Sequence, residues 1–126
     1  MATIIAGSRS ISDKQLVYET INSAPFDVQE VVSGKADGVD TIGEEWASDN
    51  DIPIKNFPYT NYISEAPTEK VAPLIRNTKM AQYADELILI WDGNSNGSKD
   101  MLKKAKEYDL EIYEKRTKDS TIDEWI

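Results

Sequence analysis

Short apolar runs alternate with stretches of helical periodicity along nearly the whole chain. We expect strands at Thr3–Ala6, Val28–Val32, Ile52–Phe57, Leu87–Trp91 and Leu110–Tyr113, and helices at Asp13–Asn22, Val39–Ser48, Pro73–Tyr83 and Ser98–Tyr108. A strand-helix alternation carried through five strands is the pattern of an α/β protein. This order constrains the fold more than any other feature of the sequence.

The run Leu87–Trp91 is apolar at every position. Such runs are typical of parallel strands with helices over both faces of the sheet. Right-handed crossovers bring every strand-to-helix loop to the carboxyl edge, where open α/β sheets gather their ligand groups. We therefore predict a single α/β domain with a mostly parallel five-stranded sheet and helices on both faces.

The chain has 126 residues, which fits one domain, predicted over residues 1–116. Residues 117–126 are predicted to form a tail whose Trp125 and Ile126 dock on this chain or on a second copy. The sequence contains no cysteine and no histidine, which excludes thiol nucleophiles, Ser-His-Asp triads, thiolate or imidazole zinc sites and disulfides. We expect no metal and no cofactor, and only carboxylate chemistry, if any.

The formal net charge is −9, which disfavours nucleic acid as a partner because such binding depends on clustered Lys and Arg. No segment approaches the roughly 18 apolar residues that span a bilayer, and no charged leader precedes Thr3. The expectation is a cytoplasmic protein without a membrane partner. Small anions remain candidate ligands where basic groups converge.

The first candidate loop, Gly7-Ser8-Arg9, follows the first strand. Glycine permits close backbone approach, and the guanidinium of Arg9 presents a fork of donors suited to phosphate. The alternative is that Arg9 is solvated beside a helix cap, and we assign Ser12, with Gln15, to that cap as a capping box.

The second candidate loop runs from residue 33 to residue 40. Its small residues expose backbone N–H groups at a helix start, which favours an anion or ribose site, and Asp40 could accept from ribose hydroxyls. The alternative for Asp40 is a structural one, since acidic side chains are favoured in any first helical turn. The candidate residues of this loop are Ser33, Gly34, Lys35, Gly38 and Asp40.

The third candidate loop follows Leu87–Trp91 and combines glycines with short polar residues, as a phosphate cradle requires. It lacks the Gly-Lys-Ser/Thr ending of a Walker A loop. The alternative is a polar loop with a serine cap. The candidates are Trp91, Asp92, Gly93, Ser95, Gly97 and Ser98.

Three cations, Arg9, Lys35 and Lys99, come from different loops that the predicted topology brings to one edge of an acidic protein. This convergence predicts an anion site.

The segment Asn56–Ala72 has no clear periodicity and either crosses this edge or is an ordinary long connection.

Further motifs complete an ordered set with these loops: Arg76-Asn77, Met80, Ala84-Asp85 and Trp91-Asp92-Gly93 through Gly97-Ser98. Over roughly residues 3 to 113 the set resembles the SLOG superfamily, which joins DNA-processing A proteins to lonely-guy phosphoribohydrolases, and within it the small YspA-like, cpYpsA-related branch. The resemblance implies a Rossmann-like sheet, a pocket for a nucleotide or nucleotide-derived ligand, and often a homo-oligomer.

In the lonely-guy enzymes an Arg of the matching helix reaches the active site, which implies a role for Arg76 and the neighbouring Asn77. Their catalytic Glu, however, falls at Met101 in this chain. Asp40, Asp92, Asp100 or Glu44 would have to replace it. Lys35 also stands where a second Gly is common.

The leading hypothesis is a sensor or sequestering module, with phosphate on residues 93–98 near Arg9, ribose at Asp40, and Trp91 or Asp92 flanking the base. The alternative is a nucleoside 5′-monophosphate phosphoribohydrolase, with Arg76 and Asp40 as the catalytic candidates.

Overall fold

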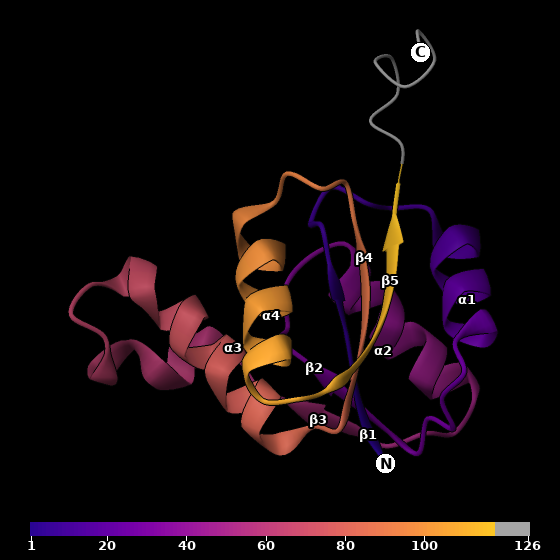
Figure 1. Ribbon diagram of the computed structural model, residues 1–126, viewed down its shortest axis with the longest axis horizontal. Helices are drawn as coiled ribbons and strands as arrows, with labels where there is room; N and C mark the ends of the chain where they lie inside the picture. Colours follow the sequence, from indigo (N-terminus) through magenta and orange to yellow (C-terminus); the bar gives the residue numbers. More distant parts are fainter. Residues whose placement is uncertain (118–126) are drawn as a thin grey trace, which may run out of the picture.

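The computed structural model describes residues 1–117, and all nine predicted helices and strands occur in the predicted order (Figure 1). The predicted docking of Trp125 and Ile126 lies outside the described residues. The strands are β1 (Ala2–Gly7), β2 (Glu30–Ser33), β3 (Ile54–Asn56), β4 (Glu86–Trp91) and β5 (Glu111–Arg116). The helices are α1 (Lys14–Ser23), α2 (Val39–Asp49), α3 (Ala72–Tyr83) and α4 (Asn96–Glu107).

The five strands form one sheet in the order β3-β2-β1-β4-β5, and every neighbouring pair is parallel. The predicted Rossmann-like α/β fold is thus confirmed, with a sheet that is parallel throughout. In this order β1 is the central strand, with β2 on one side of it and β4 on the other. The loops after β1 and β4 therefore diverge at the switch point, where open α/β sheets form a crevice for ligands.

Successive strand residues pack on opposite faces of the sheet, so the core has two layers. Ile5, Val31 and Ile88 pack with residues of α1 and α2, whereas Ile4, Val32 and Leu87 pack with residues of α3 and α4. Figure 1 shows these two helix pairs on either side of the sheet. Both faces are covered, as the continuous apolar run in β4 predicts.

Two predicted helix starts need correction. The N-cap of α1 is Asp13, whose carboxylate accepts from the Leu16 backbone N–H at 3.1 Å, and not Ser12. Both residue types cap well, and the path of the chain into the helix decides between them. Helix α4 begins at Asn96 with Ser95 as its N-cap, so Ser98 lies within its first turn.

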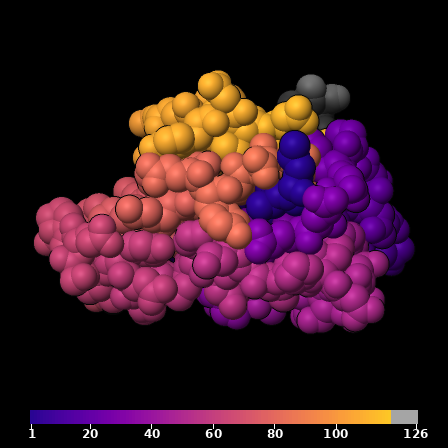
Figure 2. All heavy atoms as spheres, turned by 90° about the horizontal axis from the view of Figure 1, so that it is seen from below, coloured from indigo at the N-terminus to yellow at the C-terminus, as the bar shows by residue number. Residues whose placement is uncertain are grey.

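The segment between β3 and α3 forms two 3-10 helices, η1 (Tyr59–Glu65) and η2 (Glu69–Val71). Neither contains a buried residue. Figures 1 and 2 both show this segment extending sideways from the sheet beside α3. It forms one wall of the pocket described next.

Candidate functional site

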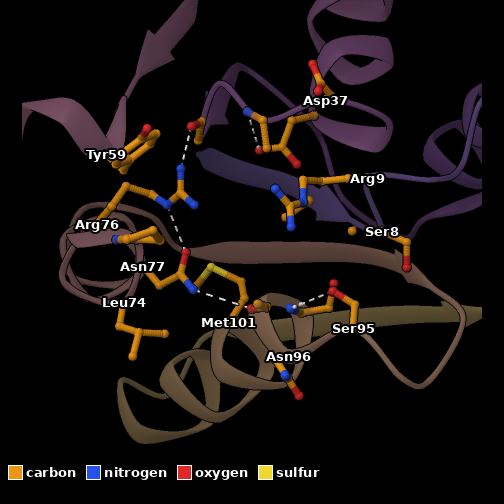
Figure 3. A pocket seen from close by; sticks show the side chains of 18 of the residues that line it. Ser8, Arg9, Asp37, Tyr59, Leu74, Arg76, Asn77, Ser95, Asn96 and Met101 are labelled. Atoms are coloured by element: carbon orange, nitrogen blue, oxygen red, sulfur yellow. Dashed lines mark hydrogen bonds between the residues drawn. The ribbon is translucent and has the colours of Figure 1, made fainter. Parts of the chain in front are cut away.

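A pocket of about 920 Å³ opens at the carboxyl ends of the central strands. The loops after β1, β2 and β4 contribute to it, together with α3 and the η1–η2 segment (Figure 3). Small-molecule sites typically occupy 300–1,000 Å³ and favour this place in the fold. The pocket is therefore large enough for a nucleotide.

The loop after β1 is packed against β4. A Cβ atom on Gly7 would lie 1.7 Å from the carbonyl oxygen of Ile90, so only glycine fits there. The next residue, Ser8, is buried, and its Oγ accepts from the Asp92 backbone N–H at 3.2 Å. Arg9 is exposed and makes no hydrogen bond or ion pair with any described residue. Its guanidinium extends over the pocket in Figure 3, available to an anion.

The loop after β4 is shaped by Asp92. One carboxylate oxygen accepts from the backbone N–H groups of Asn94 at 2.8 Å and Ser95 at 3.2 Å. These bonds, above all the one from Asn94, hold the pKa of Asp92 below its usual value. The side chain thus acts as an ionised brace of the loop and is poorly suited to donate a proton.

The amino end of α4 faces the pocket with unused donors. Ser95 caps the helix by accepting from the Ser98 backbone N–H at 3.4 Å. The N–H groups of Asn96 and Gly97, at the first two helical positions, have no acceptor within the helix. Ser98 is only 4% exposed, and its Oγ is the one buried side-chain polar atom among residues 1–117 that lacks a hydrogen-bond partner. Such an atom is rare and marks a place where a ligand or a water completes the site.

The loop after β2 contains a backbone conformation that usually requires glycine, at a position occupied by lysine. Lys35 has a φ of 61°, a left-handed conformation that favours Gly. Two contacts compensate: its backbone N–H donates to Ser33 Oγ at 3.1 Å, and its ammonium donates to Glu44 at 2.8 Å. The Ser33 hydroxyl also donates to Glu44, at 2.6 Å. Lys35 is therefore tied to a carboxylate and is less available to an anion than Arg9.

Asp40 and Arg76 meet across Gly34. Arg76 donates to the Gly34 carbonyl, and a Cβ on Gly34 would lie 2.6 Å from Arg76 Nη1 and 3.0 Å from Asp40 Oδ2. Burial raises the pKa of Asp40 from 3.8 to about 7, against the opposing effects of the Arg76 charge and the Ala36 and Gly34 backbone N–H groups. Burial also lowers the pKa of Arg76, opposed by the charge of Asp40. Both shifts have the same cause, the removal of charged groups from water.

Asn77 orients Arg76 and connects α3 to α4. Its Oδ1 accepts from Arg76 Nε at 3.0 Å, while its Nδ2 donates to Asp100 at 3.0 Å and to the Gly97 carbonyl at 3.4 Å. The side chain is 4% exposed. This network holds the guanidinium at the pocket wall, which the first turns of α3 help to form.

Most of the predicted site residues line this pocket, and five do not, among them Lys99, so that only Arg9 and Lys35 of the three predicted cations meet here. Ser33 is buried beside Glu44, and Gly38, with a φ of 74°, packs against the backbone of Ser8 and Arg9. Trp91 is 2% exposed and donates its Nε1 to Glu114 at 2.6 Å; with Gly93 and Lys99 it lines a second depression beside Arg116. The predicted residues that line the large pocket are Gly7, Ser8, Arg9, Gly34, Lys35, Asp40, Arg76, Asn77, Asp92, Ser95, Gly97 and Ser98.

The pocket also contains residues that were not among the predicted site residues: some come from the η1–η2 segment and the start of α3, and others lie within the candidate loops themselves. Their placement depends on how distant segments pack, and only the aperiodic stretch before α3 gave a signal. The main additions are Ser10, Ala36, Asp37, Tyr59, Glu69, Lys70, Pro73, Leu74 and Asn96, with Met80 and Met101 as buried parts of the lining.

The position of Met101 bears on catalysis. Its buried thioether stands where the lonely-guy resemblance places a catalytic Glu. Of the four carboxylates considered as substitutes, only Asp40 and Asp92 line the pocket. Asp100 is bonded to Asn77 and Lys104. Asp40 is the remaining candidate for proton transfer, because its pKa lies near neutrality.

Comparisons with known proteins bear on the family and the fold. Residues 1–59 match the family described as YspA, cpYpsA-related SLOG. The fold is similar to that of DNA processing protein A (DprA) from Streptococcus pneumoniae, with a TM-score of 0.70 and 21% identity over 90% of this chain. The match spans 49% of the DprA chain, so this protein covers about half of it. No curated protein matches. No helix within residues 1–117 is long and apolar enough to cross a membrane.

Proposed function

Residues 1–59 match the YspA, cpYpsA-related SLOG family, and on that premise we propose that the pocket binds a nucleotide or nucleotide-derived small molecule. The protein would act as a sensor or a sequestering module. Its action in the cytoplasm and its assembly into a homo-oligomer stay predictions.

The single observation that carries this proposal is the unpartnered, buried Ser98 hydroxyl at the amino end of α4. A phosphate there would accept from this hydroxyl and from the free N–H groups of the first helical turn, where the helix dipole also favours an anion. Arg9, exposed and without a protein partner among the described residues, would supply the counter-charge.

The middle of the pocket suits a ribose. Asp40 and Arg76 lie beside one another at Gly34, and together they offer a carboxyl group and a guanidinium edge to sugar hydroxyls. The carboxyl can accept in either protonation state and donate when protonated. A nucleoside phosphate with its phosphate at Ser98 would place its sugar between the α2 and α3 walls.

Calorimetric titration tests this proposal, with nucleoside 5′-monophosphates, cyclic dinucleotides and ADP-ribose as ligands. We expect Ser98→Ala to weaken phosphate-ligand binding about tenfold, since a hydrogen bond to a charged group is worth about 1.5–3 kcal/mol. The free protein should be equally stable or slightly more stable, because the lost hydroxyl has no partner.

The control is Ser48→Ala, which removes an exposed hydroxyl from α2 outside the pocket and should change neither quantity. The absence of heat with every ligand would refute nucleotide binding. Unchanged affinity in Ser98→Ala would refute the placement of the phosphate.

A second candidate function is supported by Asp40 alone. A carboxyl group with a pKa of about 7 beside Arg76 has the properties of a general acid, as hydrolysis of an N-glycosidic bond requires. That activity predicts release of free base from a nucleoside 5′-monophosphate, abolished in Asp40→Asn and Arg76→Ala. A nucleotide that binds and is recovered intact would exclude it.

A further inference from the structure

The end of the pocket farthest from Ser8 and Ser95 has a different character. Tyr59 and Leu74 lie there in Figure 3, and both line the pocket while remaining 38% and 40% exposed. Pro73 lies between η2 and Leu74 on the same wall. Large apolar side chains left open to a cavity, next to polar groups, are typical of a ligand subsite.

Trp91, the aromatic residue predicted from the sequence to flank the base, is not accessible from this pocket. The Trp91 ring is buried, its Nε1 is bonded to Glu114, and Arg116 lies over it at 5.0 Å. Within residues 1–117, Tyr59 is the one aromatic side chain that lines the large pocket. A planar ligand group entering this pocket has one aromatic surface to pack on.

We infer that the apolar end of the pocket is a base subsite, in which the nucleobase packs on the ring of Tyr59 and against Leu74. The inference rests on the proposed function and adds a selectivity to it: nucleoside monophosphates bind more tightly than base-free sugar phosphates. The order phosphate, sugar and base would follow the pocket from Ser98 through Asp40 to Tyr59.

Burial and charge fit this assignment. Tyr62, on the same 3-10 helix, packs against the core cluster that contains Phe57 and Met80, and thereby anchors the segment that carries Tyr59. Glu69 and Lys70 line the pocket and supply a carboxylate and an ammonium within the same wall as the apolar groups. A ring that stacks and polar groups that meet the base edge are the usual components of base recognition.

Titration with two probes tests the subsite: adenosine 5′-monophosphate or guanosine 5′-monophosphate, and ribose 5-phosphate. The wild-type protein should bind at least one nucleotide about tenfold more tightly than ribose 5-phosphate. Tyr59→Ala should remove about fivefold or more of that nucleotide affinity, as expected for the loss of one stacked aromatic, and leave ribose 5-phosphate binding unchanged. Tyr59→Phe should retain the wild-type preference, because the ring remains.

The matched control is Ile63→Ala. Ile63 lies on η1 and is also 38% exposed, but it does not line the pocket, so its loss should leave both affinities unchanged. Equal affinity of the wild type for nucleotides and ribose 5-phosphate, or an equal loss of both in Tyr59→Ala, would overturn the base subsite while leaving phosphate binding standing. No binding by any probe would overturn both proposals together.

Discussion

Asp40→Asn should remove most of the dependence of stability on pH between about pH 4 and pH 7. Asp40 is 5% exposed, and its pKa rises from 3.8 to about 7 on folding. Between these values the folded protein holds a proton that the unfolded chain lacks. Stability is therefore highest below pH 4 with respect to this group and falls as the pH rises toward 7.

The expected size follows from the same two values. Their difference corresponds to about 4 kcal/mol of unfolding free energy lost by pH 8, an order-of-magnitude figure and a large share of a typical domain's stability. The chain has no histidine, the residue whose ordinary pKa falls in this range, so few other groups obscure the effect.

Urea unfolding followed by circular dichroism, at intervals from pH 4.5 to 8.5, measures this dependence. The free energy of the wild type should fall toward pH 7 and then level off, while that of Asp40→Asn stays comparatively flat. The control Asp37→Asn removes the same charge from an exposed position three residues away and should keep the wild-type slope. Parallel curves for the wild type and Asp40→Asn would refute the reasoning.

Two more predictions follow from the packing of the pocket walls. Gly34→Ala should lower stability by about 1–2 kcal/mol and weaken nucleotide binding, because the added Cβ would displace Arg76 and Asp40. Gly97→Ala should leave stability unchanged or raise it by up to about 1 kcal/mol, because a Cβ there would meet no atom within 4 Å and alanine favours the helix. Thermal unfolding and titration check both variants, and equal stability losses would contradict the clash. Trp91→Phe should leave nucleotide affinity unchanged within twofold while lowering stability, since the ring lies outside the large pocket; a selective loss of affinity on titration would restore Trp91 to the site.

The sequence predicted the order of the elements because periodicity and turn residues are local signals. The sequence could also predict that the loops after β1, β2 and β4 lie close together, since right-handed crossovers between parallel strands place these loops at the same edge of the sheet. Within those loops, the roles of single residues were harder to assign. Gly38 packs on the Ser8–Arg9 backbone and Lys35 bonds to Glu44, and neither relation follows from residue type.

Trp91 shows why one prediction pointed to the wrong surface. Strand β4 is apolar at every position, so its sequence carries no alternation that would indicate which side chains face which helices. The structure packs Leu87, Leu89 and Trp91 in the layer with α3 and α4. The Trp91 side chain therefore lies on the face of the sheet that α3 and α4 cover, beside β5. Only the packed sheet determines this choice of face.

The pocket also explains how a chain of net charge −9 could hold an anionic ligand. Its lining carries four basic side chains, Arg9, Lys35, Lys70 and Arg76, against four acidic ones, Asp37, Asp40, Glu69 and Asp92, and burial raises the pKa of Asp40 to about 7, which lowers the negative charge of the pocket near neutral pH. Arg9 and the amino end of α4 both line the pocket and would attract an anion bound in it. The attraction is local and directional, which favours a small phosphate ligand over an extended polyanion such as nucleic acid, whose phosphates would also meet the acidic surface beyond the pocket.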